Sequence, residues 1–373
     1  METFYGIVFV VIVAGITMRL ANNYKEIAFA IAIAFIFRIS ASLINLYVVT
    51  LPDGGIDATG FESKAWMWGK GGLIEATTHF FEHGPTWVYS NVASLIYAIF
   101  GRSPLILQSI SVLAGVYCVV LVWKLSIEVW GTDGAAKISS WMVAVFPILV
   151  LYSSLTLREV FITLLLLYGM LHVVLWSKTN KITNASIALM AFSMQALLHP
   201  GVAAAGVLFL SMVFLYNSKI LVTSLINNSI LDIRSFLIIL TCTLVGFFIY
   251  INSSSLSLPY SSWLEIVKVD TLIWRTSIMA AGVAAYPSWL IADTPMQFLL
   301  LLIPKSLYFL FSPFPWDISK FKHFIGMLDG VVYMLLFLSI YSHRKYIKSN
   351  NQAILLLVFI IFLCLIFSIA VGN

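Results

Sequence analysis

Residues 27–50 read "IAFAIAIAFIFRISASLINLYVVT", and the chain continues directly with "LPDGGIDATGFESKAW" at residues 51–66. Arg38 is the only charged residue of the first stretch. A helix that rises about 1.5 Å per residue needs roughly 20 apolar residues to cross a hydrocarbon layer about 30 Å thick. The first stretch has this length and composition, so it predicts a transmembrane helix that leads into a polar, acidic loop.

Similar apolar runs recur along the whole chain of 373 residues, of which 61% are hydrophobic and only 10% are charged. A soluble domain of this size has too little interior to bury so much apolar surface. The runs are continuously apolar and do not alternate, which excludes a transmembrane β-barrel. Because backbone groups in lipid must be paired within their own segment, the runs are predicted to be helices. The sequence therefore predicts a single, all-α, polytopic transmembrane domain over residues 1–373.

About ten or eleven transmembrane helices are expected, and ten are placed at residues 3–19, 27–50, 104–125, 138–156, 160–177, 184–198, 201–217, 235–252, 324–341 and 352–371. The short basic connections between them are cytoplasmic by the positive-inside rule. If the ambiguous run 298–312 also spanned, the basic stretch "HRKYIKSN" (343–350) would lie outside. We therefore expect 298–312 to be interfacial or re-entrant, interrupted by Pro304, Pro313 and Pro315.

This topology leaves two large segments on the outer face, at residues 51–103 and 253–323. The first contains "GGLIEATTHFFEHG" (71–84) and "SNVASLIYAIFG" (90–101), which are amphipathic at helical spacing. Such stretches are typical of helices that lie along a membrane surface. The second segment is expected to be partly interfacial or re-entrant.

The acidic loop offers Asp53 and Asp57 as candidate catalytic bases, with Glu62 and Lys64 close behind them. "PDGG" is also favourable turn chemistry, so a solvated turn is the structural alternative. The cytoplasmic connections contain no phosphate-binding glycine loop, and the chain has no Cys/His zinc pattern and no G-x-S-x-G motif. This argues against the use of ATP or a nucleotide sugar at the cytoplasmic side.

Two stretches resemble the GT-C superfamily of polytopic membrane glycosyltransferases, in particular its bacterial envelope-polysaccharide members. The first is "GRSPLILQSISVLAGVYCVVLVWKLSIEVWGTDGAAKISSWMVAVFPILVLYSSLTLREVFITLLLLYG" (Gly101–Gly169), and the second is "FLFSPFPWD" (Phe309–Asp317). The order of helix, acidic outer loop, surface helices and span is also similar over about the first 200 residues. The resemblance implies that an acidic residue of the first large outer loop activates the acceptor, with Asp57 favoured and Asp53 second.

A sugar on a polyprenyl phosphate or diphosphate already carries a good leaving group, so it needs one carboxylate base and cations that hold the phosphate. The donor phosphate is expected to bind among Arg158, Arg275, Lys305, His199 and Arg38. The structural alternatives are a snorkelling Arg158 paired with its neighbour, a His199 that caps a helix end, and an Arg38 that pairs with an acidic group for structure. Acceptor or sugar contacts are assigned to Glu62, Lys64, Trp66, His79 and His83.

The resulting hypothesis is an inverting glycosyltransferase of the bacterial inner membrane, whose active site faces the periplasm. Its partners would be an undecaprenyl-linked donor and a lipid-linked glycan acceptor in O-antigen, capsule or related polysaccharide assembly, with other assembly proteins and without nucleic acid. An O-antigen polymerase that joins whole repeat units has near-equal weight, and a lipid-linked glycan flippase is a further alternative. No cofactor is expected. Catalysis without a metal is favoured over metal-dependent catalysis, because one helix carrying His79 and His83 is a weak metal site.

Overall fold

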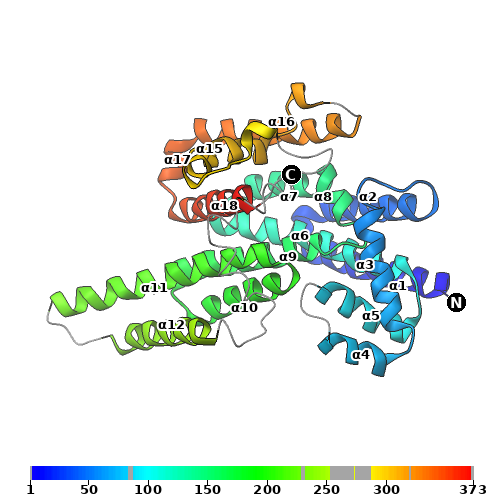
Figure 1. Cartoon of the computed structure of the whole chain (residues 1–373), viewed down its shortest axis with the longest axis horizontal. Coiled ribbons are helices and arrows are strands. Elements are labelled where there is room, and N and C mark those ends of the chain that lie inside the picture. The colour runs from blue at the N-terminus through cyan, green and yellow to red at the C-terminus, as the bar shows by residue number, and fades with distance from the viewer. Residues whose placement is uncertain are drawn as a thin grey trace. The chain divides into compact units, whose positions relative to one another are not determined.

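The computed structural model describes residues 2–82, 87–227, 232–252, 273, 287–318 and 321–370, and all regular secondary structure in them is helical (Figure 1). Within these residues, six helices are long and apolar enough to cross a membrane. They are α1 (Glu2–Asn23), α2 (Ala28–Tyr47), α6 (Pro104–Trp130), α9 (Glu159–Thr179), α11 (Ala203–Ile226) and α18 (Asn351–Ala370). The chain is thus an all-α, multi-pass membrane protein, as predicted.

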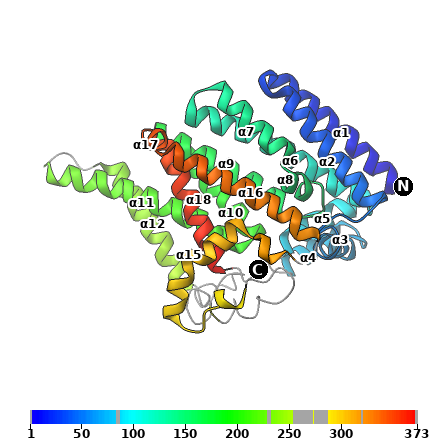
Figure 2. The ribbon, with the colours of Figure 1, turned by 90° about the horizontal axis from the view of Figure 1, so that it is seen from above.

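The chain divides into two compact units, residues 1–200 and 201–373, and each is described by itself. In the first unit α6 is the central helix, and it packs against α1, α2, α9 and α7 (Asp133–Val145). Figure 2 shows α1 and α2 side by side, and α7 also packs on α2. The helix α10 (Ile182–Leu198) packs along α9. The core between α1, α2, α6 and α7 is made of small and β-branched residues such as Ala30, Ala34, Val116, Val119 and Ala144.

The first of the two segments predicted to face outwards, residues 51–103, forms three short helices, α3 (Ile56–Gly69), α4 (Leu73–Glu82) and α5 (Val88–Phe100). Both α3 and α4 pack against α5. The structure confirms helices in the two amphipathic stretches, and their location at a membrane surface stays a prediction. The segment is anchored on the unit through α5, whose buried Ala93 and Tyr97 pack with Leu107 of α6.

The predicted continuous span at residues 138–156 is wrong, because the helix breaks at Phe146. The helix α7 ends at Val145, the short α8 (Pro147–Tyr152) follows, and a turn leads through Arg158 into α9. Pro147 has no N–H, and a residue that precedes proline is driven towards extended backbone. Phe146 has this conformation, with φ −63° and ψ 120°.

The second unit contains α11, α12 (Ile233–Asn252), α15 (Pro295–Phe311), α16 (Phe321–Ser342), α17 (Arg344–Lys348) and α18. The helix α11 packs on α12 and α18, and α15 packs on α16 and α18. The predicted interruption at Pro304 is wrong, because α15 continues through this residue and ends at Phe311, before Pro313. An internal proline removes the bond from its own nitrogen and crowds the carbonyl of the preceding turn, and apolar helices tolerate this when neighbouring helices support them.

Candidate functional site

The start of α3 packs against the turn that follows α8, and this contact brings two distant parts of the sequence together. Ala58 of α3 lies in one apolar cluster with Leu155 and Leu157 of the turn, and all three side chains are buried. The cluster therefore holds the acidic residues around Ala58 next to the residues around Leu157. Asp57 directly precedes Ala58, and Arg158 directly follows Leu157. Both are site residues predicted from the sequence.

Asp53 lies in the turn before α3, with an exposed side chain and a positive φ of 60°. Asp is one of the few non-glycine residues that accept this left-handed conformation at low cost. The Tyr152 hydroxyl donates a hydrogen bond of 3.2 Å to the Asp53 carboxylate. Asp53 is thereby tied to the end of α8, which sequence analysis did not foresee.

Asp57 is exposed in the first turn of α3, and its charge interacts with that of Glu159. Arg158 Nε lies 3.8 Å from Glu159 Oε1, and Arg158 Nη1 donates to the Leu198 carbonyl at 2.9 Å. The Arg158 guanidinium also lies 5.3 Å from the centre of the Phe61 ring of α3. Arg158 thus joins α3, α9 and the end of α10.

His199 is half-buried at the end of α10, immediately after the carbonyl that Arg158 binds. Burial and, next, the positive charge of Arg158 lower the pKa of His199. The structure therefore brings Asp53, Asp57, Arg158 and His199 to the same part of the first unit. Tyr152 and Glu159 join them, although sequence analysis did not propose either as a site residue.

The first unit contains two cavities, one lined in part by Tyr152 and Glu159 of this group and one lined by Leu198, the residue before His199. The first has a volume of about 170 Å³, and among its lining residues are Tyr152, Ser153, Glu159 and Arg38. The second has a volume of about 260 Å³ between α5, α6, α9 and α10, and its lining is almost wholly apolar. Leu198 lines the second cavity, its carbonyl accepts the hydrogen bond of Arg158, and it precedes His199 in the sequence.

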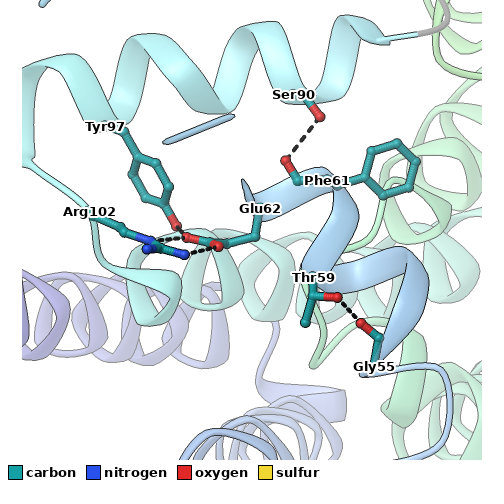
Figure 3. Close-up of polar contacts among 7 residues, drawn as sticks. All are labelled: Gly55, Thr59, Phe61, Glu62, Ser90, Tyr97 and Arg102. Carbon is teal, nitrogen blue, oxygen red and sulfur yellow. Dashed lines mark hydrogen bonds and ion pairs between the residues drawn. The ribbon is translucent and has the colours of Figure 1, made fainter. Parts of the chain in front are cut away.

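Glu62 is engaged in the best-formed ion pair of this region (Figure 3). Arg102 donates from Nε at 2.9 Å to Oε1 and from Nη2 at 2.8 Å to Oε2, and Tyr97 donates to Oε1 at 3.0 Å. Burial and, next, the Glu62 carboxylate raise the pKa of Tyr97. Glu62 therefore fastens α3 to the end of α5, and its predicted acceptor contact stays a prediction.

Lys64 and Trp66 also pack within the outer helices. Lys64 Nζ lies 3.5 Å from the centre of the Trp87 ring and 5.9 Å from that of Trp68. Trp66 meets Tyr97 edge to face, with 6.3 Å between the ring centres. Such aromatic surfaces are suited to stacking on sugar rings, and the assignment of both residues to acceptor binding stays a prediction.

Arg38 is buried in α2, and its partners are backbone carbonyls. Its Nη1 donates to Ala144 at 2.8 Å and to Ala34 at 3.2 Å, and its Nη2 donates to Val143 at 2.9 Å. The carbonyls of Val143 and Ala144 belong to the broken end of α7. These contacts give Arg38 a structural role through backbone carbonyls, where sequence analysis had expected an acidic partner, and phosphate binding by Arg38 stays a prediction.

The remaining predicted site residues are not brought to this group by the described parts of the chain. Lys305 belongs to α15 of the second unit, where it is 1% exposed and its Nζ has no hydrogen-bond partner among the described residues. This Nζ lies 5.5 Å from the centre of the Phe298 ring. Arg275 and His83 lie outside the described residues, and His79 belongs to α4 with a side chain outside the description.

The described residues contain no group of three or more His, Cys, Asp or Glu side chains that would hold a metal ion. No family model, no curated protein and no solved structure matches the chain. The features that bear on function are therefore the positions of Asp53, Asp57, Tyr152, Arg158 and His199 in the first unit.

Proposed function

We propose that the protein is an inverting membrane glycosyltransferase that uses a polyprenyl-phosphate- or diphosphate-linked donor. The observation that carries this proposal is the contact between the start of α3, which carries Asp57, and the turn before α9, which carries Arg158. A carboxylate and two basic side chains at one end of a helical unit provide a base for an acceptor hydroxyl and a site for an anionic leaving group. The resemblance of residues 101–169 to the GT-C superfamily points to the same chemistry.

In the proposed reaction, Asp57 accepts the proton of the acceptor hydroxyl as that oxygen attacks the anomeric carbon of the donor. The new carbon–oxygen bond forms while the bond to the phosphate oxygen breaks, and the phosphate leaves with the electron pair. Direct attack inverts the anomeric carbon. Arg158 stabilises the charge that develops on the departing phosphate, and His199 gives it a further hydrogen bond.

The apolar cavity supports a lipid-linked donor in preference to a soluble one. It is lined by Leu198, whose carbonyl accepts from Arg158, and by Val92 and Met194, whose side chains are about half exposed. An isoprenoid chain in this cavity would leave its phosphate next to Arg158 and His199. We place the reaction at the periplasmic face of a bacterial inner membrane, in O-antigen, capsule or related polysaccharide assembly.

The test compares Asp57→Asn with Asp133→Asn, since both aspartates are exposed in the first turn of a helix. The purified proteins are incubated with a lipid-linked acceptor and radiolabelled donors that carry one or two phosphates. We expect Asp57→Asn to lower turnover by about 10²–10⁴-fold, the usual contribution of a general base, and Asp133→Asn to leave it unchanged. Full turnover by Asp57→Asn would remove this residue from the role.

The two forms of the donor also separate the two transferase reactions. Turnover of a single sugar from the monophosphate identifies a single-sugar transferase, and joining of whole units from the diphosphate identifies a polymerase. If the wild-type protein turns over neither donor but moves a lipid-linked glycan across liposomes, the protein is a flippase and the transferase proposal fails.

A further inference from the structure

One face of α2 carries three polar side chains, Arg38, Ser42 and Asn45, at spacings of four and three residues. Side chains at these spacings share a helix face. Each of the three binds the backbone of a segment that leads to the candidate site. We propose that this face positions the segment carrying Asp57 relative to the segment carrying Arg158. The effect of this face on catalysis rests on the proposed function, whereas its effect on the relative position of the two segments does not.

Arg38 fixes the start of α8. Pro147 has no N–H to donate to the Val143 carbonyl, and the extended Phe146 also frees the Ala144 carbonyl from helical bonding. Arg38 supplies donors to both, at 2.9 Å and 2.8 Å. A cation at a helix C-terminus also interacts favourably with the helix dipole. The arginine therefore replaces the bonds that the break removes and fixes the direction in which α8 leaves α7.

Ser42 fixes the turn that follows α8. Its hydroxyl donates to the Ser154 carbonyl at 2.8 Å, and both residues are fully buried. Leu155 and Leu157, which hold Ala58 of α3, follow immediately. Arg38 and Ser42 thus bind the chain on either side of α8, and together they set the position of Tyr152 and Arg158.

Asn45 fixes the turn that carries Asp53. Its Oδ1 accepts a hydrogen bond of 3.0 Å from the backbone N–H of Leu51. Gly54 lies so close to the Asn45 side chain that a Cβ there would collide with Oδ1. The turn before α3 and the turn before α9 are therefore both fastened to α2. The direct link between them is an exposed hydrogen bond and one small apolar cluster.

Gly115 of α6 adds to the same arrangement. A Cβ on this residue would lie 2.6 Å from Arg38 Nε and 2.7 Å from Ser153 Cβ, so only glycine permits this approach. Arg38 is thus held between α6 and the turn that it positions. Burial of this kind gives Arg38 a positioning role that does not require contact with a phosphate.

A cysteine pair measures this geometry without any activity assay. The three native cysteines are first replaced by Ala (Cys118, Cys242 and Cys364). Two new cysteines are then introduced, one at Ala58 and one at either Leu155 or Leu157. The pair that forms a disulfide faster is used for the measurements. Ser42→Ala is compared with Ser40→Ala, a matched control because Ser40 lies on the exposed face of α2. We expect Ser42→Ala, Asn45→Ala and Arg38→Met each to slow disulfide formation on the order of tenfold. Arg38→Lys should restore part of the rate that Arg38→Met loses.

Kinetics of the native-cysteine protein provide the second readout. A positioning role predicts that Arg38→Met and Ser42→Ala lower kcat with little change in the KM for the donor, whereas a phosphate contact predicts a raised KM for Arg38→Met. Unchanged cross-linking in Ser42→Ala and Asn45→Ala overturns the inference, even if Arg38→Met fails to fold. If cross-linking slows but the wild-type protein transfers no sugar, the proposed function fails and the positioning inference stands.

Discussion

The Tyr152 hydroxyl donates a 3.2 Å hydrogen bond to the Asp53 carboxylate, and this bond joins segments that lie 99 residues apart. The bond is exposed, so its net stabilisation is at the lower end of the range of about 0.5–1.5 kcal/mol. Asp53→Asn keeps both an acceptor for Tyr152 and tolerance of the positive φ. The substitution therefore changes the charge and leaves the local conformation intact.

We expect Asp53→Asn to lower transferase turnover about tenfold, much less than Asp57→Asn, because Asp57 is the favoured base. Tyr152→Phe, which keeps the carboxylate and removes the hydrogen bond, should have a smaller effect than Asp53→Asn. Turnover is measured with labelled lipid-linked donor, and Tm is measured in parallel to verify folding. If Asp53→Asn lowers turnover as far as Asp57→Asn does, the two aspartates share the catalytic role or exchange it.

The Glu62–Arg102 pair is predicted to stabilise the fold more than the Glu128–Lys178 pair, although both have N–O distances of 2.8 Å. The Glu62 side chain is 9% exposed and also accepts from Tyr97, whereas the Glu128 side chain is 34% exposed. We expect Glu62→Gln to cost about 1–3 kcal/mol and Glu128→Gln less than about 0.5 kcal/mol. Tm in detergent measures both variants. Equal shifts in Tm would show that burial of Glu62 does not strengthen its pair.

Close packing of α9 on α10 depends on Gly169. A Cβ at this position would lie 2.5 Å from the Phe192 ring, and Phe192 is itself buried. Gly169→Ala is expected to cost about 1–3 kcal/mol through overpacking. Gly15→Ala is the matched control, because Gly15 also lies within an apolar helix and has no neighbour within 4 Å of its added Cβ. A Tm that falls equally in both variants would contradict this assignment.

His199 is expected to make the protein less stable on acidification. Burial and Arg158 lower its pKa in the folded protein, so the unfolded chain binds a proton more readily. This loss of unfolding free energy is absent above the ordinary histidine pKa of about 6.5. It grows as the pH falls below that value, until the pH reaches the lower pKa of His199 in the folded protein. Tm measured from pH 7.5 to 5.5 should fall less steeply in His199→Gln than in wild type. Parallel curves of Tm against pH for His199→Gln and wild type would contradict a lowered pKa of His199.

Sequence patterns predicted the helices well where one physical signal dominated. Long apolar runs such as 104–125 and amphipathic stretches such as 90–101 form helices because burial and backbone pairing favour the same structure. The errors concern proline, whose effect depends on its tertiary surroundings. Pro147 breaks a helix where Arg38 satisfies the carbonyls that it frees, and Pro304 lies inside a helix that neighbouring helices support.

For the candidate site, the sequence indicated residue types and did not indicate their partners. A mid-span Arg38 signalled a buried charge, but its two partners outside α2 are backbone carbonyls that carry no sequence signal beyond the "FP" at residues 146–147. Glu62 was noticed and Arg102 was not, because their pairing depends on the packing of α3 on α5. Tyr152 was missed for the same reason, since its bond to Asp53 requires the turn after α8 to meet α3.

The contacts of Arg38 also have a consequence for biosynthesis. Its acceptors at Val143 and Ala144 lie 105 and 106 residues further along the chain. A ribosome that adds roughly 5–20 residues per second needs on the order of 5–20 s to make that length. An arginine at a helix centre opposes insertion by about 2.5–3.5 kcal/mol. Until α7 has been made, the Arg38 guanidinium of the nascent second helix therefore has the Ala34 carbonyl of its own helix and lacks the two acceptors of α7.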